Sequence, residues 1–210
     1  MNKTKIETFD YTWNPVTGCL HGCDYCYAAR ISNRFNLNFI PEFHENRFEP
    51  NKLEGKNIFV CSMADLFGDW VPEQWILDVL DYVSKDLKNN YFFLTKNPKR
   101  YKEFLFYKNC YVGFSASNQA DYDKRAKEAG RVDFVSFEPL QGEIDILYRS
   151  FNFDWAIIGQ ETGNRKDKAK FNILWVYSLM AQCSRKNIPV FVKDNIDPDR
   201  KIQQHIIKKD

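Results

Sequence analysis

Six short runs of apolar, β-branched and aromatic residues recur along the chain, with polar or helix-like segments between them. Each run is almost continuous in residues of the buried type, which is typical of strands covered on both faces in a parallel sheet. A weaker seventh run covers residues 9–13. The six stronger runs lie at residues 58–62, 91–95, 111–115, 134–138, 155–159 and 189–193.

Helical periodicity appears between several of these runs. Residues 73–83 follow Pro72 with apolar positions at helical spacing, and residues 174–181 do the same ahead of the last run. Strands that alternate with helices predict right-handed crossovers and a parallel sheet, in either a doubly wound fold or a β/α barrel. The 210 residues fall short of the roughly 250 of a closed eight-fold barrel. We therefore predict one α/β domain over residues 1–210, a partial (open) TIM-like barrel of six or seven parallel strands.

Nearly every predicted strand ends in polar side chains. In parallel α/β folds the carboxyl ends of the strands line the ligand site, so these residues are candidates for binding. Each one taken alone is equally explained as the start of a loop, but six polar strand ends together favour a site. The residues concerned are Ser62, Thr95, Lys96, Ser115, Ser117, Asn118, Glu138, Gln160, Glu161 and Lys193.

Composition and charge narrow the class of protein only slightly. Hydrophobic residues make up 44% and charged residues 28%, which are ordinary globular values, and the net charge of +2 neither requires nor excludes a nucleic acid. The chain has no apolar run of the roughly 18 residues that a membrane span needs, and residues 1–8 lack the apolar core of a secretory signal. We therefore expect a cytoplasmic protein with no membrane partner.

The cysteines supply the candidate chemistry, because disulfides are rare in the cytoplasm. Three of the six form a C-x-x-x-C-x-x-C motif at Cys19, Cys23 and Cys26, and the others are isolated. Three thiolates on one loop fit a [4Fe-4S] cluster with one iron left without a cysteine ligand. Zinc is the alternative, with His21 or His44 as a fourth ligand. For His21 a structural role, as a hydrogen-bond partner of a sulfur or of the loop backbone, is favoured over ligation. The missing second C-x-x-C pair favours the cluster over zinc.

This motif resembles the signature of the radical S-adenosylmethionine (SAM) superfamily, in which an aromatic residue precedes the last cysteine, as Tyr25 does here. Further blocks resemble a phage-associated family of unknown function that is grouped with radical SAM proteins, and the resemblance spans roughly residues 10–195. The blocks begin with Thr12-Trp13-Asn14-Pro15-Val16-Thr17-Gly18-Cys19 and continue through Leu94-Thr95-Lys96-Asn97-Pro98, Ser136-Phe137-Glu138-Pro139-Leu140 and Ile157-Ile158-Gly159-Gln160-Glu161.

The resemblance implies an enzyme that cleaves SAM reductively at a [4Fe-4S] cluster and so generates a 5′-deoxyadenosyl radical. Cys19, Cys23 and Cys26 would hold the cluster, and Tyr25 would lie near the adenine. Ser62 stands where the superfamily has a glycine-rich strand that receives the SAM amino group. No residue is assigned as catalytic. The remaining candidate contacts for SAM or substrate are Ser115, Ser117, Asn118, Glu138, Gln160, Glu161 and Lys193. Two interpretations are open for Lys193, which are an ion pair with Glu138 or the binding of an acidic group.

Partners follow from the same resemblance. The reaction needs an electron donor such as a flavodoxin or ferredoxin. The cysteine segment also resembles that of spore photoproduct lyase, which makes a nucleic acid one candidate for the unidentified substrate. The competing hypothesis is a non-catalytic zinc or Fe–S binding module that acts as a partner protein. In either case Cys61, Cys110 and Cys183 are expected to be dispensable.

Overall fold

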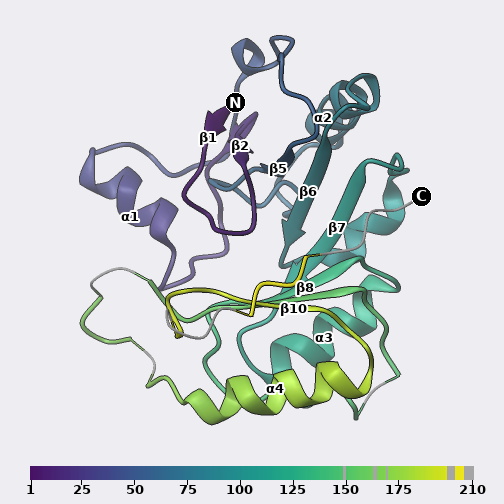
Figure 1. Ribbon diagram of the computed structural model, residues 1–210. Helices are drawn as coiled ribbons and strands as arrows, with labels where there is room; N and C mark the ends of the chain where they lie inside the picture. The colour runs from purple at the N-terminus through teal and green to yellow at the C-terminus, as the bar shows by residue number, and fades with distance from the viewer. Residues whose placement is uncertain (149, 163–164, 169, 198–201, 206–210) are drawn as a thin grey trace. The chain divides into compact units, whose positions relative to one another are not determined.

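All seven predicted strands are present in the structure, a computed structural model that describes residues 1–148, 150–162, 165–168, 170–197 and 202–205 (Figure 1). The backbone forms two compact units, and we call residues 1–111 unit 1 and residues 112–210 unit 2. That the chain folds as one domain stays a prediction.

Unit 1 contains a sheet with the strand order β1-β2-β5-β6. The strand β1 is antiparallel to β2, and the other neighbours are parallel, with Phe59 of β5 opposite Phe92 of β6. A separate antiparallel pair joins β3 to β4. The bounds are β1 Asn2–Lys3, β2 Tyr11–Trp13, β3 Val16–Thr17, β4 Glu42–Phe43, β5 Asn57–Val60 and β6 Asn90–Thr95.

Unit 2 holds four parallel strands in the order β7-β8-β9-β10. The first of them begins two residues before the boundary between the units. Helices connect β7 to β8 and β9 to β10, as the predicted β-α alternation requires, whereas the described residues between β8 and β9 form no helix. The bounds are β7 Cys110–Ser115, β8 Phe134–Phe137, β9 Trp155–Ile158 and β10 Val190–Val192.

Helices connect the strands in both units. Two of them match the predicted segments and bury one apolar face, with Ile76 and Val83 of α2 and Leu179 of α4 fully covered. Among the described residues, none of the helices has the length and apolar character of a membrane span. The bounds are α1 Tyr27–Arg34, α2 Glu73–Lys85, α3 Gln119–Ala129 and α4 Ile173–Arg185, with 3-10 turns at η1 Glu45–Arg47 and η2 Pro98–Glu103.

Aromatic side chains dominate both cores. In unit 1, Trp13 lies 4.5 Å from Tyr82 and Phe67 lies 4.7 Å from Tyr101 between ring centroids. In unit 2, Phe134 and Trp155 stand opposite each other on β8 and β9, and both are buried. Burying one such side chain contributes about 1.5–3 kcal/mol, so these rings hold the strands whose ends carry the candidate residues.

Candidate functional site

The loop between β3 and α1 carries the three cysteines of the motif, and its start is fixed by a close backbone contact. Gly18 has φ +84°, and a Cβ there would lie 1.9 Å from the carbonyl oxygen of Ile40. The Gly18 N–H donates to the Met63 carbonyl at 3.0 Å, and the Cys19 N–H donates to that of Phe39 at 3.3 Å. Only glycine fits this position, which explains why a glycine precedes the first cysteine.

The three loop thiols are half-buried and form no disulfide. Burial, reinforced by the nearby charges of Asp65, Cys23 and Cys26, raises the pKa of Cys19 to about 11 despite a hydrogen bond from the His21 backbone. The Cys26 Sγ accepts the Ala29 N–H at 3.4 Å and so caps α1. Among the described residues, no three His, Cys, Asp or Glu side chains lie close enough to form a ready-made metal site.

The isolated cysteines differ from the loop cysteines in exposure. Cys61, Cys110 and Cys183 are at most 4% exposed, and burial raises the pKa of Cys61 and of Cys183 to about 12. Because the exposed thiolate is the reactive form, we expect iodoacetamide to modify the loop cysteines of the native protein about tenfold faster or more. Peptide mapping by mass spectrometry measures this, with the denatured chain as the control. Equal rates at all six cysteines would contradict the structure.

Asp65 connects the cysteine loop to the end of β6. Its side chain is buried and accepts four hydrogen bonds, which come from two side chains and two backbone N–H groups. The donors are His21 Nε2 at 2.7 Å, Thr95 Oγ1 at 2.6 Å, the Lys96 N–H at 2.8 Å and the Phe67 N–H at 3.1 Å. A carboxylate with this many partners holds the loop and the strand end in one arrangement.

Lys96 brings a positive charge to one of the cysteines. Its Nζ donates to Cys23 Sγ at 2.9 Å, hydrogen-bonds the Tyr25 hydroxyl and lies 4.6 Å from the centre of the Tyr25 ring. Burial alone would lower the pKa of Lys96, but Tyr25 and Cys23 outweigh it and hold the pKa above its usual value. The ammonium group therefore stays charged beside the sulfur.

The other candidates of unit 1 lie around the same loop. The Ser62 hydroxyl donates to Asn14 Oδ1 at 3.1 Å, and the same oxygen accepts the Met63 N–H at 3.0 Å. The Tyr27 hydroxyl donates to the Ser62 carbonyl at 2.5 Å, which fastens α1 to the residues that follow β5. Ser62 thus has partners within the fold, as Tyr25 has in Lys96.

Neither histidine proposed for a zinc site faces the thiols through its Nε2 atom. The Nε2 atom of His21 hydrogen-bonds Asp65, and the His21 ring packs edge-on against Trp70 with 4.7 Å between the ring centroids. The Nε2 atom of His44 lies 2.8 Å from Thr17 Oγ1. Burial, followed by the charge of Arg47, lowers the pKa of His44. The side chain of His21 has the structural role that the sequence favours, but through a carboxylate instead of a sulfur or a backbone group.

In unit 2, the candidates that follow β7 support the start of α3. Asn118 is the N-cap, and its Oδ1 accepts the Asp121 N–H at 3.0 Å, while Asp121 Oδ2 accepts the Ser117 N–H at 3.2 Å. Ser115 and Ser117 are both buried. This reciprocal cap satisfies N–H groups that a helix start leaves open. Helix capping explains Asn118 locally, and binding by these three residues stays a prediction.

Glu138 and Lys193 form an ion pair between the residues that follow β8 and β10. The Lys193 Nζ lies 2.6 and 2.7 Å from the two carboxylate oxygens, and the side chains are 26% and 12% exposed. Gly159 makes room for this pair, since a Cβ there would come within 2.9 Å of the Glu138 carboxyl carbon. The structure thus brings together two residues that the sequence marks as a candidate pair.

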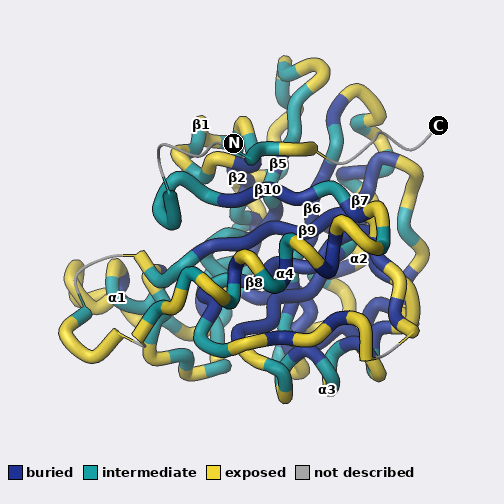
Figure 2. The backbone as a smooth tube through the Cα atoms, turned by 60° about the horizontal axis from the view of Figure 1, so that its bottom comes forward, coloured by how far each residue is buried: buried dark blue, intermediate teal, exposed yellow. Residues whose placement is uncertain are grey.

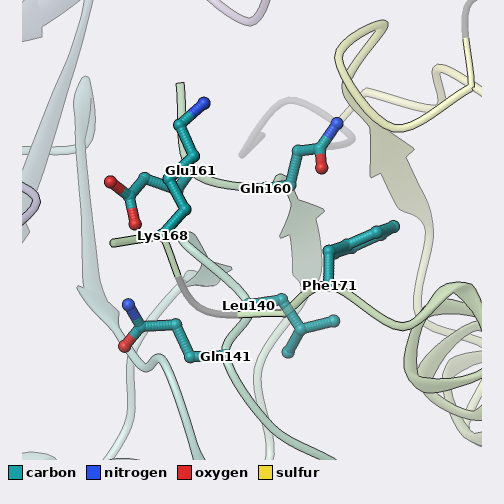
Figure 3. A pocket seen from close by; sticks show the side chains of 6 residues that line it. All are labelled: Leu140, Gln141, Gln160, Glu161, Lys168 and Phe171. Atoms are coloured by element: carbon teal, nitrogen blue, oxygen red, sulfur yellow. The ribbon is translucent and has the colours of Figure 1, made fainter. Parts of the chain in front are cut away.

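A small pocket of about 100 Å³ opens beside β9 (Figure 3). The Glu161 side chain is 7% exposed and pairs with Arg165 through two hydrogen bonds of 2.7 and 2.9 Å. Gln160 hydrogen-bonds Asn195. Figure 3 shows Glu161 and Lys168 on one side of the pocket and Phe171 on the other. The lining residues are Leu140, Gln141, Gln160, Glu161, Lys168 and Phe171.

The chain is similar to known proteins in its sequence and in its fold. A model of the family described as "Protein of unknown function (DUF5131)" matches residues 3–205. The chain belongs to this family. No curated protein matches the sequence.

Two solved structures of spore photoproduct lyase mutants are similar to the chain. One is 12% identical with a TM-score of 0.55, and the other is 11% identical with a TM-score of 0.59; each match covers 91% of this chain and 78% of the other. At this identity the likeness concerns the fold. It confirms the predicted α/β class, a partial and open TIM-like arrangement of parallel strands.

Two residues that define the loop's surroundings could not be identified from the sequence as partners of the loop. Lys96 and Asp65 are recognisable in the sequence only as polar residues at strand ends, and nothing there indicates that they reach Cys23 and His21. The signal that marks them as candidate site residues is their polarity near the end of a buried strand. The partners are fixed by the path of the chain in three dimensions.

Proposed function

We propose that the protein is a cytoplasmic radical SAM enzyme in which Cys19, Cys23 and Cys26 hold a [4Fe-4S] cluster. The observation that carries the proposal is the contact of the Lys96 ammonium group with Cys23 Sγ at 2.9 Å, on a loop whose three thiols are free. A half-buried cation beside a cysteine sulfur suits an anionic iron–sulfur centre. The fold shared with spore photoproduct lyase, a radical SAM enzyme, supports an enzyme over a binding module.

The donor set fits such a cluster in its chemistry. Three thiols lie within eight residues, and the protein already directs the Ala29 N–H and the Lys96 ammonium group at two of the sulfurs. Hydrogen bonds to cluster sulfurs and nearby charges are the means by which a protein sets the reduction potential. When bound, the cluster with SAM supplies one-electron reductive cleavage of the bond between sulfur and C5′.

The residues of the chain have positioning roles in this proposal. Asp65 fixes His21 and the end of β6, so the loop and Lys96 keep their relative positions. Lys96 orients the Tyr25 hydroxyl and neutralises charge at Cys23. Tyr25 and Ser62 provide candidate SAM contacts in unit 1, and the polar strand ends and the pocket of unit 2 provide candidate contacts for SAM or the substrate. No proton transfer is required of them.

Anaerobic reconstitution of the full chain tests the proposal. We expect a brown protein with about four iron and four sulfide per chain, which converts SAM to methionine and 5′-deoxyadenosine after reduction with dithionite. Absorption, metal analysis and chromatography of the products measure this. A colourless protein that binds zinc, or an iron–sulfur protein that leaves SAM intact when reduced, would favour the binding module instead.

Replacement of Lys96 by glutamine tests its contact with the sulfur. Loss of a positive charge beside the cluster disfavours the added electron, so we expect the midpoint potential to fall by about 60 mV or more, a tenfold change in the reduction equilibrium. Lys99→Gln is the matched control, because that side chain is half exposed and pairs with Asp69 at the surface. Spectroscopic redox titration measures the midpoint potential of both variants. Equal midpoint potentials in the two variants would show that Lys96 does not act on the cluster.

The substrate is proposed to be a nucleic acid. Beside the pocket of unit 2, residues 165–168 and 170 carry four basic side chains and one acidic one, and Lys166, Lys168 and Lys170 are exposed. Exposed lysines beside a pocket are suited to phosphate contacts. We expect DNA or RNA to bind with a salt-dependent affinity that the triple lysine-to-glutamine variant weakens, as fluorescence anisotropy can measure. Binding that is absent in wild type would exclude this substrate class.

A further inference from the structure

Helix α1 turns its apolar side outward. Its buried positions are Ala28 and Ser32, which are 3% and 7% exposed, whereas Tyr27, Ile31 and Phe35 are 42%, 44% and 65% exposed. These three large side chains are spaced four residues apart and therefore share one face across the end of the helix. A surface helix normally buries its apolar stripe. The reversed pattern leaves an apolar face on the surface of unit 1.

The exposed apolar surface extends beyond the helix. The Leu37 N–H donates to the Ser32 carbonyl at 2.9 Å, which holds the following segment against α1. Ile40 lies beside Gly18, where the cysteine loop begins. Figure 2 shows α1 largely in the intermediate and exposed colours, and residues 33–38 are all exposed. We call the exposed side chains the α1 patch: Leu20, Tyr27, Ile31, Phe35, Leu37 and Ile40.

The charges on α1 itself are basic, whereas exposed Asp24 and Glu42 stand just outside the segment that contains it. Arg30 and Arg34 lie on the helix, and residues 25–41 contain no aspartate or glutamate. An exposed apolar helix face bordered by charged side chains is typical of a protein interaction site. The partner that matches it combines an apolar contact surface with an acidic border.

The patch also lies next to the proposed cluster ligands. Cys26 caps α1 through its sulfur, and Ile31 follows five residues later, about 7.5 Å along the axis at 1.5 Å per residue. Leu20 follows Cys19 directly. A protein bound to the α1 patch would therefore sit close to the thiols.

We propose that the α1 patch is the docking surface for an acidic one-electron carrier of the flavodoxin or ferredoxin type; this inference rests on the proposed function. The reduced carrier gives up one electron and is oxidised, and the cluster held by the cysteine loop is reduced by one electron, with no bond made or broken in this step. The apolar face supplies contact area, and Arg30 and Arg34 attract the acidic border.

The test compares the Ile31→Ser/Phe35→Ser double variant with Leu105→Ser, a control at a side chain that is 90% exposed elsewhere in unit 1. A flavodoxin and a plant-type ferredoxin serve as probes, and their binding to the full chain is measured by titration calorimetry at low and high salt. We expect the double variant to raise the Kd about tenfold or more for the carrier that binds wild type, since two anchors are removed. Arg34→Glu should weaken binding as well, and salt should weaken it in wild type.

A second readout separates docking from cluster chemistry. In the reconstituted protein, we expect the carrier to reduce the double variant about tenfold or more slowly than wild type, while dithionite reduces both at the same rate. Unchanged carrier binding in the double variant, or no binding of either carrier to wild type, would overturn the inference. The inference would also be overturned if the double variant kept its carrier binding and lost self-association or binding to anionic vesicles instead. If wild type builds no cluster, the proposed function fails, and the binding titration still decides the docking surface.

Discussion

Alanine in place of Cys23 is expected to abolish the cluster. Cys23 is one of three thiols in the motif and the one that receives the Lys96 ammonium group. With two cysteines left, the reconstituted variant should retain little iron and sulfide, and its yield of 5′-deoxyadenosine should fall by about a hundredfold or more, because loss of a ligand affects metal binding more than the 10 to 100-fold of an outer contact. Iron analysis and product chromatography measure both effects.

Cys183→Ala is the matched control for this experiment. Cys183 is fully buried in α4 of unit 2, where alanine suits the helix and removes only one sulfur atom. We expect a modest loss of stability and an unchanged iron content. A circular dichroism spectrum and a thermal melt show that each variant is folded. Full iron loading of Cys23→Ala would overturn the ligand assignment, whereas loss of iron in Cys183→Ala alone would point to other ligands.

Asp65→Ala is expected to be the most destabilising single change outside the aromatic cores. The substitution removes the acceptor for the buried Phe67 N–H, the half-buried Lys96 N–H, the Thr95 hydroxyl and His21. Unsatisfied buried donors cost about 1–3 kcal/mol each, so we expect a loss of about 3–5 kcal/mol in the free energy of unfolding. At about 2–4 °C per kcal/mol for a chain of this size, Tm should fall by roughly 6–20 °C.

The control for Asp65 is Asp81→Ala in α2. The Asp81 carboxylate pairs with Lys85 at 2.6 Å but is 62% exposed, so its loss should cost about 0.5 kcal/mol or less. Asp65→Asn retains one acceptor oxygen and should lie between the two. Thermal melts of the three variants provide the measurement. Equal Tm values for Asp65→Ala and Asp81→Ala would contradict the hydrogen-bond network described for Asp65.

The sequence predicts the strands well because each buried strand is a continuous apolar run bounded by polar residues. It misses β1, a two-residue edge strand with both side chains exposed. It also gives no specific signal for α3, whose buried positions are Tyr122, Ala126 and Ala129 among charged residues. In both cases the element depends on hydrogen bonds and caps more than on a hydrophobic pattern.

For the candidate site, the spacing of the cysteines was enough to mark the loop, since ligands that lie close in sequence need no knowledge of the fold. Contacts between distant segments could not be predicted in this way. Lys96 reaches Cys23 across 73 positions, and Asp65 reaches His21 across 44. The pairing of Glu138 with Lys193, 55 positions apart, was anticipated only as one of two alternatives, because the sequence does not show which strand ends are neighbours.

The sulfur that caps α1 has a thermodynamic consequence. If Cys26 Sγ both accepts the Ala29 N–H and ligates iron, then the free energy of metal loading and that of ordering the first turn of the helix are linked. Linkage is reciprocal: whatever stabilises α1 tightens the hold on iron, and iron in turn stabilises α1. A protein bound along this helix would therefore slow the loss of iron to a chelator. The lifetime of the cluster in the presence of a chelator would then measure the non-covalent binding of that protein.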